Sequence, residues 1–150
     1  MAENQRLRII LEQQDAADRA HVAELARQAM VESRAKASRT RVVNEWWQLC
    51  GVLAQSVAKA NDAMTGGRKL YVQHYNPHAE RTVADVIILF DDKYSEDVER
   101  KCVVGVDLEG TVFVSINESM PQRKEYRLNI WTATIEQIEG IVYDFMELNI

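Results

Sequence analysis

The first 50 residues contain neither proline nor glycine, and this absence constrains the fold more than any other feature of the chain. The stretch is rich in Ala, Arg, Gln, Glu and Leu, which are good helix formers, so it predicts a long N-terminal helix. A helix running unbroken to Met64 would measure about 95 Å, whereas a compact body formed by the other residues would be about 30 Å across. We therefore expect the helix either to break and fold back or to extend and contact another chain. If it breaks, residues 33–40 are the expected place, because Ser38 or Thr40 would cap a new helix start.

The stretch from Val42 to Met64 has the most persistent helical pattern. Its apolar residues recur at intervals of three and four, which is typical of an amphipathic helix with a wide buried face. The adjacent Trp46 and Trp47 lie about 100° apart on such a helix and widen that face, so we expect it to pack on a sheet with both tryptophans in the core. A ligand-stacking or membrane-interface platform is the alternative interpretation of the tryptophan pair.

The remainder of the chain predicts an antiparallel sheet of four to five strands, largely a meander, followed by a C-terminal amphipathic helix packed on the sheet. Alternating or continuous apolar runs place strands at residues 69–75, 82–90, 101–106, 111–116 and 126–131. Asp107-Leu108-Glu109-Gly110 predicts a tight hairpin turn. Thr132 or Thr134 is expected to cap the final helix, and Gln137, three residues after Thr134, would complete a capping box. The buried stripe of this helix is expected to run from Ile135 to Met146. The predicted class is α+β, with a helical arm over residues 1–40 and a single α+β domain over 41–150.

Charge is distributed unevenly along the chain. Residues 1–41 hold eight Arg or Lys against six Asp or Glu, while the whole chain has a net charge of −5. The acidic body argues against general nucleic-acid binding, although it leaves the arm open. No apolar run approaches the roughly 18 residues of a membrane span, and the first residues carry charge, so we expect neither secretion nor membrane insertion. Cys50 and Cys102 have apolar neighbours and resemble small buried hydrophobes, which favours a reducing cytoplasm.

No catalytic, metal or cofactor site is predicted. His74 and His78, with Asp85 and the Asp91-Asp92 pair, are candidate metal ligands, but a strand and a loop give them no enforced convergence. Gly66-Gly67-Arg68-Lys69 resembles a phosphate-binding loop in composition only, because these glycines follow a helix and precede a strand. The acidic run from Asp91 to Glu99 lacks the ligand spacing and central glycine of a calcium loop.

The arm carries a weak heptad pattern. Ile9, Ala16, Ala23 and Met30 repeat every seven residues, and the companion positions turn basic after Ala20. Val22, Leu25 and Ala29 form a second stripe on another face, so the register is not fixed. These residues predict a homo-oligomer, for which a two-fold dimer is the commonest solution, and a solvated arm is the alternative.

Three functional hypotheses follow. The leading one is a non-enzymatic protein-interaction or assembly module that self-associates through its N-terminal helix, with another protein as a possible partner. The alternative is a small-molecule-binding domain or enzyme that uses the sheet face as a pocket, with Tyr71, His74 and Tyr75 as polar groups. The third is nucleic-acid binding through a basic cluster in the arm, which is weakened by the lack of interleaved aromatic residues; the cluster comprises Arg34, Lys36, Arg39 and Arg41.

Overall fold

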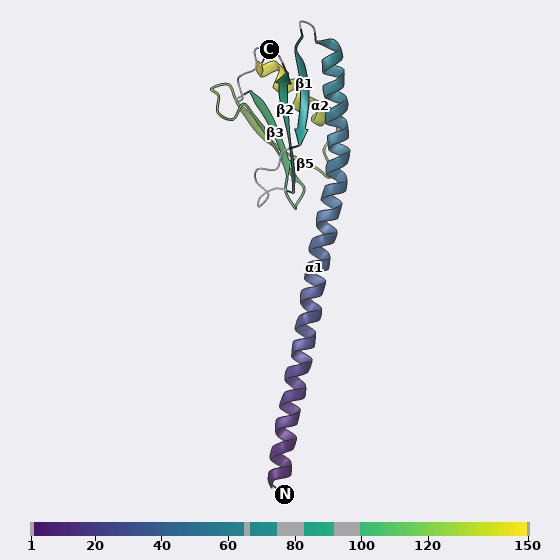
Figure 1. The fold of residues 1–150 in the computed structure, drawn as a ribbon, viewed down its shortest axis with the longest axis vertical. Coiled ribbons are helices and arrows are strands. Elements are labelled where there is room, and N and C mark those ends of the chain that lie inside the picture. The colour runs from purple at the N-terminus through teal and green to yellow at the C-terminus, as the bar shows by residue number, and fades with distance from the viewer. Residues whose placement is uncertain (1, 65–66, 75–82, 92–99, 150) are drawn as a thin grey trace. The chain divides into compact units, whose positions relative to one another are not determined.

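A computed structural model describes residues 2–64, 67–74, 83–91 and 100–149. The chain divides into two compact units, Met1–Ala37 and Ser38–Ile150. In chain order the elements are α1 (Ala2–Ala63), β1 (Lys69–His74), β2 (Ala84–Asp91), β3 (Lys101–Val106), β4 (Thr111–Ile116), β5 (Lys124–Asn129) and α2 (Ile135–Asn149). Figure 1 labels all of them except β4. The predicted α+β class, with a long first helix and a last helix after the sheet, is confirmed.

Helix α1 continues through residues 33–40, so the break considered there is absent. Ser38 and Thr40 lie inside the helix and do not cap a new one. The physical reason is that serine and threonine lower helix stability by only fractions of a kcal/mol, whereas the residues that interrupt helices more strongly, glycine and proline, are missing from this stretch.

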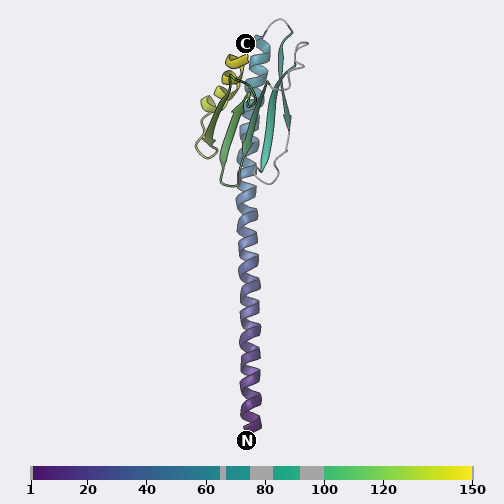
Figure 2. The same cartoon turned by 90° about the vertical axis from the view of Figure 1, so that its left-hand side faces the viewer.

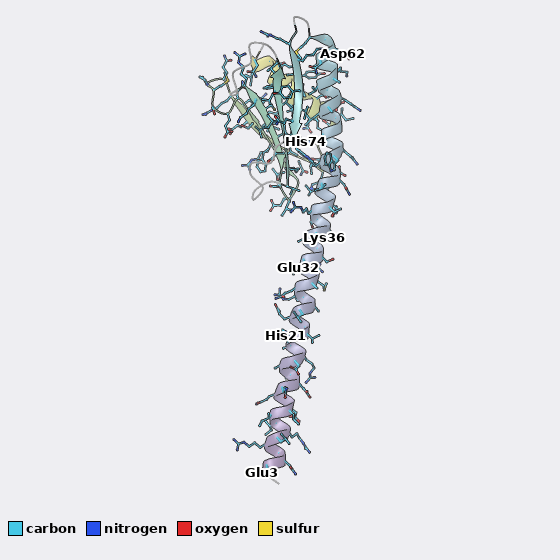
Figure 3. The ribbon with its side chains drawn as sticks, viewed as in Figure 1. Glu3, His21, Glu32, Lys36, Asp62 and His74 are labelled. Atoms are coloured by element: carbon cyan, nitrogen blue, oxygen red, sulfur yellow. The ribbon has the colours of Figure 1, made fainter. Side chains whose placement is uncertain are left out.

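The first unit is a single helical segment without a core of its own. All its described side chains, residues 3–37, are exposed, and Figure 3 shows Glu3, His21 and Glu32 standing out from the helix. Glu24 and Arg27 form an ion pair of 2.6 Å one turn apart. Such exposed pairs add little to the stability of a helix, because water screens the two charges.

The second unit is built on a five-stranded antiparallel sheet in the order β1-β2-β3-β4-β5. Each strand pairs with its sequence neighbour, as a meander requires, and β1 and β5 are the edges. Alternate residues of the strands point to one face, where they form a single core with the buried stripes of α1 and α2. Both helices therefore cover the same face of the sheet, and Figure 2 shows the sheet in front of α1 with α2 beside it.

The tryptophan pair is split between core and surface. Trp46 is 2% exposed and belongs to the sheet-facing stripe that runs from Val42 through Leu49 and Leu53, whereas Trp47 is 58% exposed. The prediction that both tryptophans pack in the core is therefore wrong for Trp47. Because adjacent helical residues differ by 100°, a stripe centred on Trp46 leaves its neighbour on the flank of the helix.

The predicted hairpin turn and helix cap are confirmed in atomic detail. Asp107 Oδ1 accepts hydrogen bonds of 2.9 Å from the N–H groups of Glu109 and Thr111, and Gly110 closes the turn with a φ of +87°. At the start of α2, the Gln137 N–H donates to Thr134 Oγ1 and the Thr134 N–H donates to Gln137 Oε1. This reciprocal pair is the capping box expected from the sequence.

Candidate functional site

The side chain of Asn61, near the end of α1, is bound to the outer edge of β1. Its Nδ2 donates to the Leu70 carbonyl at 2.8 Å, and the Leu70 N–H donates to Asn61 Oδ1 at 2.6 Å. Both backbone groups of Leu70 therefore point away from β2. Backbone groups alternate in direction along a strand, so those of Val72 and His74 also point outward, while Tyr71 and Gln73 bond to β2. No described residue bonds to these outward groups of Val72 and His74.

A pocket of about 310 Å³ opens beside this edge, between α1 and β1. It is lined by Trp47, Cys50, Gly51, Leu53, Ala54, Val72, His74 and Val86. Leu53 and Val86 are buried and form the floor, whereas Trp47, Gly51, Ala54 and His74 are exposed and form the rim. The rings of Trp47 and His74 contact each other with centroids 5.7 Å apart and planes tilted by 59°, and Figure 3 labels His74 next to α1. The lining is largely apolar, which suits an apolar side chain or ligand group.

The cysteine in this pocket is not an activated nucleophile. Cys50 is half-buried, and its burial raises the pKa of the thiol to about 11. The nucleophilic form of cysteine is the thiolate, so Cys50 is almost fully protonated at neutral pH. Burial and the charge of Asp144 also raise the pKa of Cys102, which lies in the core.

The structure separates the predicted polar groups of the sheet face. His74 lies on the rim of the pocket. Tyr71 lies between Leu70 and Val72, whose side chains point to the core. The Tyr71 side chain therefore lies on the opposite face of the sheet, where it is 44% exposed. Tyr75 lies outside the described residues. Of the two described side chains, His74 lines the pocket and Tyr71 does not.

The candidate metal ligands lie partly outside the described ranges, since His78 and Asp92 fall in the gaps. Asp85 is buried in β2 and points to the face opposite His74, because Val86, its neighbour, is paired with His74. Among residues 2–64, 67–74, 83–91 and 100–149, no three His, Cys, Asp or Glu side chains come close enough together to hold a metal ion. Most of the acidic run from Asp91 to Glu99 also lies outside these ranges.

One member of the predicted basic cluster packs within the second unit. The guanidinium carbon of Arg41 lies 5.3 Å from the ring centroid of Trp131, as in a cation–π contact. Arg34, Lys36 and Arg39 are exposed on α1. Nucleic-acid binding by these residues stays a prediction.

The comparisons with known proteins assign no family to this chain. No protein-family model, curated protein sequence or solved structure matches it. In the described part of the chain, no helix has both the length and the hydrophobicity needed to cross a bilayer. The functional argument therefore depends on the exposed surfaces and the pocket.

The exposed flank of α1 that borders the pocket was not predicted from the sequence. Trp47, Gly51, Ala54, Ala58 and Asn61 follow one another at intervals of four, three, four and three residues, which places them on one side of the helix. This second stripe was visible in the sequence beside the stripe of Trp46. The sequence did not show that this stripe is exposed, because tertiary packing decides which stripe of the helix faces the sheet.

Proposed function

We propose that this chain is a non-enzymatic interaction or assembly module that self-associates through its N-terminal helix. The observation that supports the proposal is the exposure of large apolar side chains along the first unit. Eight of them are between 51% and 65% exposed, namely Leu7, Ile9, Ile10, Leu11, Val22, Leu25, Met30 and Val31. Apolar surface on this scale marks interaction sites more often than free surface.

A second copy of the arm would cover part of this surface. The predicted seam has Ile9 and Met30 at its ends and Ala16 and Ala23 between them, with Ala20 at a companion position. Small alanine side chains allow two helices to approach closely, while the larger end residues supply buried area. The basic companions Arg27 and Arg34 limit the length of the apolar seam and favour one relative direction of the two helices. A two-fold dimer is the simplest closed arrangement.

Charge placed on the seam tests the proposal. In the variant Ala16→Glu/Ala23→Glu, two carboxylates enter the predicted contact, and we expect weaker self-association in sedimentation velocity at tens of micromolar. The matched control is Gln14→Glu/His21→Glu, which adds two carboxylates at the same seven-residue spacing on another side of the helix. All four positions are exposed, so folding should be unaffected. Equal association of the two variants, or a monomeric wild-type chain, would contradict the proposal.

The pocket beside Trp47 supports a second candidate function, the binding of a small apolar or aromatic molecule. Its volume of about 310 Å³ lies at the lower end of the range of ligand sites. A thermal-shift screen against metabolites and nucleotides tests it, since a ligand that binds only the folded state raises the melting temperature, and the rise grows with the logarithm of ligand concentration above the dissociation constant. A concentration-dependent shift by one compound that Trp47→Ala abolishes would favour this function. The two free cysteines suit a reducing compartment, and we propose the cytoplasm.

A further inference from the structure

The two edges of the sheet differ in how they resist pairing with another strand. Edge strands of natural proteins commonly carry charges or proline that discourage intermolecular pairing. Strand β5 has Lys124, Glu125 and Arg127 among its six residues. Strand β1 has Lys69 at its start and then no Asp, Glu, Lys, Arg or Pro from Leu70 to His74. Asn61 occupies the edge at Leu70, and among the described residues nothing bonds to the outward backbone groups of Val72 and His74, which can accept a further strand.

The helix surface beside this edge is depleted of charge. On the flank of α1 that borders the pocket, the exposed positions are Trp47, Gly51, Ala54 and Ala58. None carries a charge, although charged residues are frequent among the exposed residues 3–41 of the same helix. Loss of charge around an exposed tryptophan is characteristic of the core of a protein interface.

We infer that the outer edge of β1 and the adjoining flank of α1 form a two-fold interface with a second copy of this chain, on a surface separate from the arm. The outward backbone groups define the register. Val72 pairs with the partner's His74, His74 pairs with the partner's Val72, and each pair exchanges both N–H···O bonds. Gln73 then faces its own counterpart across the two-fold axis. The two sheets join as one continuous antiparallel sheet through their β1 strands.

The same axis fits α1, which is why a second copy is favoured over an unrelated extended peptide. On β1 the axis passes Gln73, about 10 Å from Leu70 at 3.3 Å per residue. On α1 a point between Gly51 and Ala54 is about 13 Å from Asn61, which is hydrogen-bonded to Leu70. The two positions agree to within one helical turn. An axis there places Gly51 opposite the partner's Ala54 and Trp47 opposite the partner's Ala58.

This arrangement matches large side chains with small ones. No atom lies within 4 Å of a Cβ built on Gly51, so the backbone there is open to close approach by another helix. Trp47 is 58% exposed, so only about that share of the roughly 150–250 Å² that an aromatic side chain buries is still available for a contact. In the dimer its free face packs over the small residues of the partner helix, and the open side of each pocket is closed by the other copy. An unrelated peptide would satisfy the edge of β1 but not this pairing along α1.

Disulfide trapping tests the register. Cys residues that face each other in a non-hydrogen-bonded antiparallel pair have Cα atoms about 4.5 Å apart, within the range of a disulfide. We expect Gln73→Cys to form a covalent dimer under mild oxidation, measured by non-reducing electrophoresis. Glu125→Cys is the matched control, because the strand pairing places Glu125 in the same row of the sheet as Gln73, on the opposite edge. Both are made in the full chain carrying Ala16→Glu/Ala23→Glu, so that the arm does not hold the copies together.

A charge variant tests the helix contact without touching the strand. In the Ala16→Glu/Ala23→Glu chain, Ala54→Lys places two lysines near each other across the axis, and we expect the dimer dissociation constant to rise at least tenfold in sedimentation equilibrium. Gln55→Lys adds the same charge at the next position and should leave the dissociation constant unchanged, because adjacent helical residues point about 100° apart. Ala54 and Gln55 are both exposed on α1. Equal dissociation constants for the two lysine variants, or equal trapping of Gln73→Cys and Glu125→Cys, would overturn the inference. A monomer at tens of micromolar in the Ala16→Glu/Ala23→Glu chain would also overturn it.

Discussion

Gly110 is held in a conformation and a space that only glycine fits. Its φ of +87° lies in the left-handed region, and a Cβ there would collide with side-chain atoms of Trp131 and Ile130. Trp131 is fixed in that place by a hydrogen bond of 3.2 Å from its Nε1 to the Glu109 carbonyl. The crowding therefore cannot be relieved by a simple rotamer change, because the indole would lose its bond.

We expect Gly110→Ala to lower the free energy of unfolding by at least about 2 kcal/mol, from left-handed strain and overpacking together. Urea denaturation followed by circular dichroism measures the change. Gly140→Ala is the matched control, because Gly140 lies inside α2 with no atom within 4 Å of its added Cβ. An alanine there should raise the free energy of unfolding by up to about 1 kcal/mol. A Gly110→Ala variant as stable as wild type would show that the turn adapts.

Alkaline pH should destabilise the second unit, because three of its side chains have raised pKa values in the folded state. Burial raises the pKa values of Cys50, Cys102 and Tyr126, and for Tyr126 the hydrogen bond of 3.0 Å to Asp144 and the charge of that carboxylate add to the effect. The unfolded thiols release their protons near pH 8.5, while the folded Cys50 retains its own up to about pH 11. Between these values the folded state binds more protons, so its stability falls as pH rises.

The urea midpoint measured at pH 7, 8.5 and 10 tests this alkaline loss. In Cys50→Ala the midpoint should fall less between pH 8.5 and 10 than in wild type, because one group that titrates differently in the two states has been removed. Gln55→Ala, at an exposed position of the same helix, should leave the slope as in wild type. A midpoint that does not change up to pH 10 would contradict the argument.

At the scale of elements, the sequence predicted what depends on local pattern. The five strands, the Asp107–Gly110 turn and the Thr134–Gln137 capping box depend on residue alternation, glycine and short-range hydrogen bonds, which a sequence displays directly. Of the two alternatives that the sequence left open, the break near residues 33–40 does not occur, because helix propensity is favourable throughout that stretch.

Features that depend on how elements pack could not be predicted from the sequence. Trp46 and Trp47 both lie in apolar helical stripes. Only the position of the sheet places Trp46 in the core and Trp47 on the surface. Ile135 fits the apolar stripe of α2 but lies 58% exposed in its first turn. The bond between Asn61 and Leu70 joins residues whose pairing has no local signal, although it closes one end of the candidate site.

At the scale of the whole molecule, the two proposed contacts have a joint consequence that neither has alone. Each is two-fold, so a surface on one copy meets the same surface on the next. A chain with one such surface stops at a dimer, whereas a chain with two can bind a different neighbour through each. The size of the assembly therefore depends on the number of self-complementary surfaces that each copy carries.

We therefore expect the wild-type chain to exceed a dimer as its concentration rises, measured by light scattering coupled to size-exclusion chromatography. Ala16→Glu/Ala23→Glu should stop at a dimer held through β1, and Ala54→Lys should stop at a dimer held through the arm. The combined variant should be monomeric, since no self-complementary surface is left intact. Gln14→Glu/His21→Glu/Gln55→Lys carries the same added charges and should assemble like wild type. If both Ala16→Glu/Ala23→Glu and Ala54→Lys gave monomers, the two sets of residues would belong to one interface, and the proposal of two separate surfaces would fail.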